Sequence, residues 1–182
     1  AQFFLLVRFA KATVTVIPAT GGSSISADTT GGAYTSLTGP VISEGVTADI
    51  GTGTIILDAP SGFIFDTSGT APTALVTRTA GSGSDNRNIN NLTSGSTIAV
   101  TVSTTQLTIT ITDATSNSVT NSLTWQNVRV RPTAGTPLAS GNITKSGTAS
   151  ISGVTAGSTN LGALTEVAGA KSQLVITAEP SM

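Results

Sequence analysis

Residues 106–112 read Gln-Leu-Thr-Ile-Thr-Ile-Thr and carry the clearest structural signal in the chain. The three aliphatic residues fall on one side of an extended backbone and the three threonines on the other. Strict alternation of this kind predicts a half-buried β-strand. Residues 97–103, directly before it, alternate in the same way and predict a second strand.

The same period of two recurs on both sides of this pair, and helical periodicity is nearly absent. Further strands are expected at residues 2–9, 13–17, 53–58, 63–65, 74–79, 122–131 and 173–177, and a weaker hairpin at residues 142–152. The change of parity near Gln126-Asn127 predicts a β-bulge in the longest of them. Residues 19–45 and 80–96 are rich in small polar residues and are expected to be mostly loop.

Short strands separated by turn signals every 8–12 residues or so are typical of a β-sandwich. We therefore expect an all-β fold, an antiparallel Ig-like or jelly-roll β-sandwich formed as one domain by residues 10–182, preceded by an extended N-terminal strand over residues 1–9. The predicted core consists of apolar residues on alternating positions: Ile55, Leu57, Phe63, Phe65, Leu75, Val100, Leu107, Ile109, Ile111, Leu123, Trp125, Val128 and Val130.

The composition limits the classes of function that this chain can have. Only 9% of the 182 residues are charged, and the net charge is −1. Because Thr and Ser make up roughly 30% of the chain, the hydration of the surface must depend on hydroxyl groups more than on charged groups. A sequence pI near 5.1 gives no attraction to nucleic acid. No apolar stretch approaches the 18 or so residues of a membrane span, and we expect no membrane insertion of the mature chain.

The chain contains neither His nor Cys, which excludes Ser-His-Asp and Cys-His catalysis and His- or Cys-based metal sites. The nine acidic residues are scattered, which excludes an EF-hand loop. Asp85, Asn86 and Asn88 offer oxygen ligands for calcium, but a polar turn is the simpler explanation and the one we favour. We therefore predict no catalytic residue, no cofactor and no metal, and a protein that is not an enzyme. Asn91 and Asn142 begin Asn-x-Thr glycosylation patterns.

Two segments near the ends of the chain echo each other. Residues 10–17 read Ala-Lys-Ala-Thr-Val-Thr-Val-Ile, and residues 170–177 read Ala-Lys-Ser-Gln-Leu-Val-Ile-Thr. Their lysines, Lys11 and Lys171, are 160 positions apart, which is 171 minus 11. One interpretation is that the two segments fill the same structural slot, so that the end of one module is the beginning of the next. The alternative is that so short a match arises by chance.

Three stretches resemble strands of the Ig-like β-sandwich modules of large secreted bacterial surface and fibre proteins. They are Gly53-Thr-Ile-Ile-Leu-Asp-Ala-Pro-Ser-Gly-Phe-Ile-Phe-Asp66, Asn121-Ser-Leu-Thr-Trp-Gln-Asn-Val-Arg-Val-Arg-Pro132 and Lys171-Ser-Gln-Leu-Val-Ile-Thr177. The resemblance implies an extracellular or cell-surface location in a repetitive or fibrous context. Residues 2–9 depart from it, because they fit no ordinary linker.

The N-terminal segment suggests how subunits could join. Phe3, Leu5, Val7 and Phe9 line one face of an extended backbone, and Phe4 and Leu6 line the other. A strand that is apolar on both faces must be covered, and donation to the groove of an identical subunit covers it and builds a homopolymer. The simpler alternative is that residues 2–9 form the first strand of the chain's own sheet.

These observations predict a structural subunit of an extracellular filament or pilus-like fibre that assembles by β-strand donation. Two alternatives stay open. The first is a tandem Ig-like stalk module of a cell-surface adhesin. The second is a carbohydrate- or ice-binding sandwich, suggested by the threonine ladder Thr108, Thr110 and Thr112.

Overall fold

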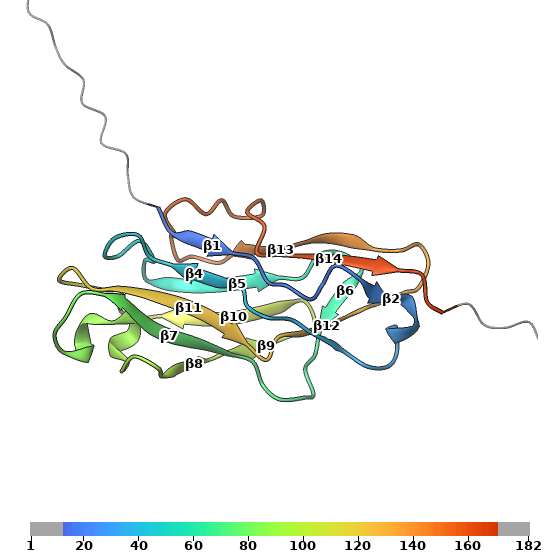
Figure 1. Ribbon diagram of the computed structural model, residues 1–182, viewed down its shortest axis with the longest axis horizontal. Coiled ribbons are helices and arrows are strands. Elements are labelled where there is room, and N and C mark those ends of the chain that lie inside the picture. The colour runs from blue at the N-terminus through green and yellow to red at the C-terminus, as the bar shows by residue number, and fades with distance from the viewer. Residues whose placement is uncertain (1–12, 171–182) are drawn as a thin grey trace, which may run out of the picture.

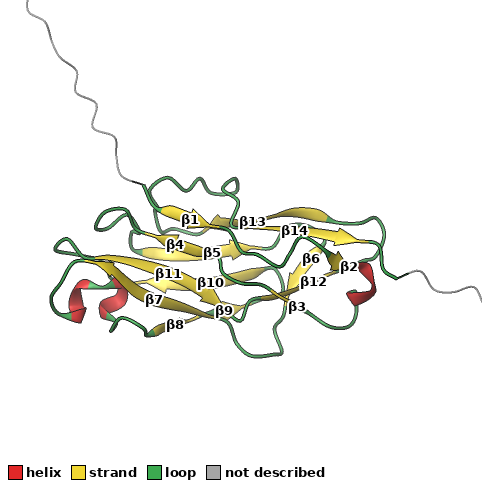
Figure 2. Cartoon of the chain, in the orientation of Figure 1, coloured by secondary structure: helices red, strands yellow, loops and turns green. Residues whose placement is uncertain are grey.

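The computed structural model describes residues 13–170, so the predicted strands at residues 2–9 and 173–177 lie outside the described residues. Within that range the fold is an antiparallel β-sandwich, as predicted from the sequence. Its helical content is confined to three short 3₁₀ turns, η1 (Ala27–Thr29), η2 (Asp85–Arg87) and η3 (Ile89–Asn91), which lie near the two ends of the body (Figure 2). No helix in this range is both long and apolar enough to cross a membrane.

One layer of the sandwich is a five-stranded sheet with a short extension. Its strand order is β1 (Thr15–Ile17), β4 (Val41–Ser43), β11 (Thr120–Gln126), β7 (Thr73–Ala80) and β8 (Thr97–Ala99). The extension is a three-stranded sheet in the order β3 (Thr35–Ser36), β12 (Arg129–Pro132) and β6 (Phe63–Phe65). β3 pairs with β12 just as β4 pairs with β11. The segment that contains β3 and β4 therefore pairs with the segment that contains β11 and β12 in both sheets.

The other layer is a six-stranded sheet. Its order is β2 (Ile25–Ser26), β14 (Gly162–Val167), β13 (Ser140–Ser146), β5 (Gly53–Asp58), β10 (Gln106–Ile111) and β9 (Thr101–Val102). All pairings are antiparallel except β2 with β14, the first and last strands of this sheet along the chain, which run in the same direction. Ala19 also forms a parallel bridge to Gly162, which extends this contact toward β1.

Segments that pass from one layer to the other close both sides of the sandwich. On one side, β1 pairs with β4, and after Pro18 the chain continues to β2 at the edge of the opposite sheet. On the other side, β8 pairs with β7, and after Val100 the chain continues to β9 beside β10. These crossings leave only short edge strands, which limits edge-to-edge aggregation.

The described body is elongated, and the chain enters and leaves it at opposite ends (Figure 1). The parallel pairing explains this arrangement, because two strands that run side by side in the same direction begin at one end and finish at the other. Val14 N donates to Ser152 O at the entry end, over 3.1 Å. Ala170 N donates to Asp28 Oδ2 at the exit end, over 2.8 Å. Both ends of the described chain are therefore held to the body by hydrogen bonds.

The buried core confirms eleven of the thirteen predicted core residues and corrects two. Leu75 is only partly buried, because its neighbours Ala74 and Val76 face inward instead. The register explains the difference: Ala74 lies opposite Trp125 and Val76 opposite Leu123, so the inward parity of β7 follows these two large residues. Val100 is half-buried at the crossing between β8 and β9 and packs against the core from the side.

Several predicted strand boundaries were wrong. The parity change near Asn127 is a break between two strands, with Asn127 in the left-handed region at φ 57°, after which β12 pairs in the extension sheet. Residues 97–103 likewise form two short strands in different layers. The hairpin predicted at residues 142–152 was wrong: this segment contributes one strand, β13, which ends at Ser146 and pairs with β14 and β5. β4 and β14 were not predicted at all.

Candidate functional site: the polar network around Arg78

The loop that follows β7 folds back onto that strand at the entry end of the body. Gly81 and Gly83 have φ values of 82° and 113°, a region that side chains with a Cβ rarely adopt, and they allow the reversal. Ser84 then precedes η2, and η3 follows at once. The loop thus presents several backbone carbonyls and short polar side chains toward the last residues of β7.

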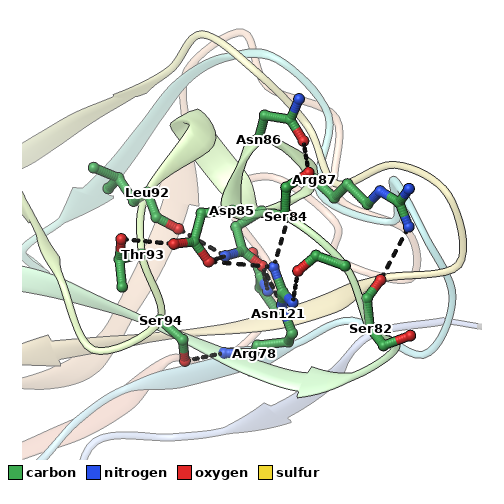
Figure 3. A network of polar contacts seen from close by, with 12 residues as sticks. Arg78, Ser82, Ser84, Asp85, Asn86, Arg87, Leu92, Thr93, Ser94 and Asn121 are labelled. Atoms are coloured by element: carbon green, nitrogen blue, oxygen red, sulfur yellow. Dashed lines mark hydrogen bonds and ion pairs between the residues drawn. The ribbon is translucent and has the colours of Figure 1, made fainter.

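The guanidinium of Arg78, on β7, binds the oxygens of this loop (Figure 3). Its Nε donates to Asn88 Oδ1 over 2.8 Å, its Nη1 to Gly83 O over 2.8 Å and its Nη2 to Ser84 O over 3.0 Å. Asp85 Oδ1 lies 3.5 Å from Nη2 and completes an ion pair. A planar group with five donors suits such a ring of acceptors.

This arrangement bears directly on the calcium hypothesis for Asp85, Asn86 and Asn88. The carboxylate of Asp85 and the amide oxygen of Asn88 turn toward Arg78, and Asn86 Oδ1 accepts a hydrogen bond from Ser84. The protein's own guanidinium therefore stands where a bound cation would neutralise these oxygens. Residues 13–170 contain no cluster of three or more His, Cys, Asp or Glu side chains that could hold a metal ion.

The network continues inward through two amides. Asn121, which is fully buried on β11, donates from Nδ2 to Asn88 Oδ1 over 3.1 Å and accepts from Ile89 N over 2.7 Å. Its own backbone N donates to Glu44 Oε2 over 2.8 Å. The chain of contacts thus runs from the exposed loop, across β11, to a carboxylate inside the sandwich.

Glu44 lies at the inner end of this network, where it is 7% exposed to solvent. Its Oε1 accepts from Ile50 N over 3.2 Å and from Thr115 Oγ1 over 2.9 Å. Burial raises the pKa of Glu44 above its ordinary value of 4.5, and the three hydrogen bonds, which favour the ionised form, oppose that rise only in part. The negative charge of Asp49 raises the pKa further.

We expect Glu44→Gln to change how stability depends on pH. Because the pKa of Glu44 is higher in the folded state, the unfolded chain loses this proton first as pH rises. The wild-type free energy of unfolding should therefore fall from near pH 4.5 until the folded-state pKa is passed, and then level off. Glutamine has no titrating carboxyl group, so the free energy of unfolding of the variant should not show this fall with pH.

Urea unfolding of both proteins at a series of pH values tests this expectation. The difference between the two free energies of unfolding isolates Glu44, since the other titrating groups are common to both chains. Parallel pH curves would show that Glu44 titrates alike in the folded and unfolded states.

Other charged side chains within residues 13–170 make structural contacts. Arg129 pairs with Asp66 over 2.9 Å, and the hydrogen bonds of Ser68 to Asp66 are the main cause of the lowered pKa of that carboxyl. Arg131 lies 4.6 Å from the ring centroid of Tyr34, within cation–π range. Lys145 is buried and donates to the carbonyls of Gly147 and Ala149, and burial lowers its pKa.

The remaining sequence candidates do not gather at one place. Asn91 is exposed in η3 with φ 56°, and the hydroxyl of Thr93 in its glycosylation pattern donates to Asp85 Oδ2. Asn142 is exposed on β13, in the opposite layer. Phe3, Phe4, Leu5, Leu6, Val7 and Phe9 lie outside the described residues.

Two shallow hollows mark the described surface. One, of about 380 Å³, lies at the entry end and is lined by Gly45, Val46, Thr47, Ala80, Ser118 and Thr120. The other, of about 300 Å³, is lined by Ser36, Leu37, Thr70, Asn127 and Arg129. The first has no ionisable lining residue and the second has only the paired Arg129, so neither brings together an acid and a base.

The sequence pointed to Asp85 and Asn88, but not to Arg78 and Asn121, which bind them, nor to Glu44, which binds the backbone of Asn121. The available signal was Arg78, a charged residue inside the predicted strand 74–79, and Asn121, a polar residue directly before the predicted strand 122–131. Comparison with known proteins gives no further assignment, because no family model, curated protein or solved structure matches the chain.

Proposed function

We propose that this protein is a structural, load-bearing unit of an extracellular filament and that it is not an enzyme. The observation that carries the proposal is the path of the chain, which enters the body at one end, leaves at the other and is tied down at both. A unit built in this way transmits tension along its long axis. The polar groups that sequence analysis singled out for chemistry serve instead to hold loops to strands.

Identical subunits joined by β-strand donation are the assembly that the sequence of residues 2–9 favours. Main-chain hydrogen bonds would supply affinity, and Phe3, Leu5, Val7 and Phe9 would set the register by fitting successive pockets. Burial of these four side chains at about 1.5–3 kcal/mol each gives an upper limit of about 6–12 kcal/mol for the junction. That range is sufficient for a stable non-covalent fibre.

A unit of a tandem cell-surface stalk is the second candidate. The opposite positions of the two chain ends favour it as well, because units in series need entry and exit at opposite ends. The echo between residues 10–17 and 170–177 supports the same arrangement.

Negative-stain microscopy of the purified 182-residue chain separates the two candidates. We expect fibres from the full chain and folded monomers from a variant that lacks residues 1–9. Phe3→Asp should abolish fibres, because a buried unpaired carboxylate is strongly unfavourable, whereas Gln2→Asp, a charge at a position that is already polar, should not.

Monomers from the full chain would favour the stalk. Fibres that persist without residues 1–9 would show that another contact carries assembly, and unfolding of the deletion variant would place these residues in the subunit's own core. Circular dichroism of each variant distinguishes the last case.

A further inference from the structure

β12 carries two arginines on the outer face of the extension sheet, nearer the exit end than the entry end of the body (Figure 2). Arg129 and Arg131 alternate with the buried Val130 and Pro132, so both lie on the outside. Their backbone positions are roughly 7 Å apart along the strand. The two side chains therefore form one positive patch.

This patch differs from the other cationic groups of the described chain. Within residues 13–170 the other three are Lys145, which is buried, and Arg78 and Arg87, which bind carbonyl oxygens of the loop after β7. The outer face of β12 is therefore the part of the described surface where positive charge is presented by a strand and not by that loop.

Asp66 holds Arg129 in place from below. The side chain of Asp66 is 5% exposed, and its Oδ2 lies 2.9 Å from Nη2 of Arg129. Its Oδ1 accepts hydrogen bonds from Ser68 N, Ser68 Oγ and Gly69 N, so both carboxylate oxygens are occupied. The contact to Nη2 lacks hydrogen-bond geometry, and the guanidinium of Arg129 donates no hydrogen bond to another residue in the described part of the chain. Its donors are therefore available to a further acceptor.

Arg131 is fixed by different neighbours. Its guanidinium lies 4.6 Å from the ring centroid of Tyr34, and its Nη1 donates to Gly32 O over 3.1 Å. Asp66 is the only carboxylate of the described chain that pairs with either arginine. Two positive charges against one negative charge leave a net charge of +1 on this face, which matches a ligand with a single negative charge.

The hollow of about 300 Å³ adjoins Arg129. Its other lining residues are Ser36, Thr70 and Asn127, which are exposed, and Leu37, which is 7% exposed. Hydroxyl and amide side chains both donate and accept hydrogen bonds. The hollow thus combines a positive charge, neutral polar groups of both kinds and one apolar residue.

These groups fit a carboxylated sugar better than a phosphate. A guanidinium can donate two parallel hydrogen bonds to a carboxylate, the neutral side chains suit the hydroxyl groups of a sugar ring, and Leu37 suits its C–H face. A phosphate monoester carries a charge of about −1.5 to −2 at neutral pH, more than the net charge of this face can balance. A volume at the lower end of the range of ligand sites, which is about 300–1,000 Å³, favours one sugar ring in each hollow.

We propose that the outer face of β12 binds acidic polysaccharide, with the carboxylate of one sugar on Arg129 and its hydroxyl groups on Ser36, Thr70 and Asn127. The inference goes beyond the structural role and does not rest on it, because these residues belong to a sheet face and not to the ends of the body. In a filament the sites repeat once per subunit. Weak single sites then add up along one polysaccharide chain.

Titration calorimetry of the 182-residue chain with a linear trimer of galacturonic acid tests the proposal. The methyl ester of the same trimer has the same ring hydroxyl groups and no charge, and we expect it to bind at least tenfold more weakly. Inorganic phosphate should also bind at least tenfold more weakly than the trimer, because it offers nothing to the neutral side chains of the hollow.

A matched pair of substitutions places the site. Asn127 and Asn117 are both exposed and both lie in the left-handed region, at φ 57° and 51°, which aspartate also adopts. Asn127→Asp should weaken binding of the trimer at least tenfold, because it puts a negative charge beside Arg129. Asn117→Asp changes the net charge equally and should alter binding less than twofold. Arg129→Gln should also abolish binding, and Asn127→Asp has the advantage that it leaves the pair with Asp66 in place.

The inference is overturned if the trimer does not bind, if its methyl ester binds equally well, or if the two asparagine variants lose equal affinity. Phosphate that binds as tightly as the trimer would show a general anion site and overturn the assignment to a sugar. Circular dichroism of each variant verifies that it is folded. None of these results bears on fibre formation, which microscopy of the 182-residue chain tests separately.

Discussion

Trp125→Ala is expected to lower the free energy of unfolding by about 3–5 kcal/mol, the range typical of truncating a large buried aromatic residue. Trp125 is 1% exposed and lies on β11 directly opposite Ala74, so the smallest side chain of the inward face of β7 sits beside the largest of the core. In the variant, alanines would face each other at positions 74 and 125 and leave a cavity that neither strand can close.

The chain has a single tryptophan, so this variant has no tryptophan fluorescence. Its unfolding in urea should therefore be followed by circular dichroism. Trp125→Phe is the matched control. The indole Nε1 of Trp125 is buried without a hydrogen-bond partner, so phenylalanine removes an unsatisfied donor together with some volume. Its cost should be well below that of alanine. A loss under about 1 kcal/mol for Trp125→Ala would place the residue outside the core.

The fold class and most of the core could be predicted from the sequence because period-two alternation is a local signal. Residues 53–58 and 63–65 form strands with the predicted bounds, and β10 differs only at its last residue. Alternation states which residues share a face but not which face points inward. Leu75 shows this limit, since the inward face of β7 is decided by Leu123 and Trp125 on the neighbouring strand.

The polar network could not be predicted from the sequence because its contacts join distant segments. Glu44 and Asn121 are 77 positions apart, and Asn88 and Asn121 are 33 apart. The oxygens around Asp85 were recognisable as a cluster, but the cation that satisfies them, Arg78, comes from the preceding strand through a turn that depends on Gly81 and Gly83. The crossings of strands between layers at Pro18 and Val100 are likewise properties of the assembled sheets.

The response of the body to force should depend strongly on the direction of pulling. Tension between Thr13 and Ala170 runs along β1, β2 and β14, so the hydrogen bonds that hold these strands are loaded together. Tension between Ser61 and Thr104 acts where β5 ends and β10 begins and separates their paired residues one after another. Loading in shear requires many bonds to fail at once, whereas peeling requires one at a time.

Because the chain has no cysteine, pairs of introduced cysteines provide the only attachment points. One variant carries Thr13→Cys and Ala170→Cys, and the other carries Ser61→Cys and Thr104→Cys. The four positions are exposed or lie at the ends of the described chain, so the two variants should unfold in urea within about 0.5 kcal/mol of each other. A difference in force then reports the direction of loading and not a difference in stability, since forced unfolding is governed by the unfolding rate.

Single-molecule stretching of these two variants tests the load-bearing role most directly. We predict one cooperative unfolding event for the Thr13 and Ala170 pair, at a force several-fold above that for the Ser61 and Thr104 pair. Equal forces in the two directions, or strands that leave one by one at low force when the chain ends are pulled, would contradict the proposal that this protein is built to carry tension.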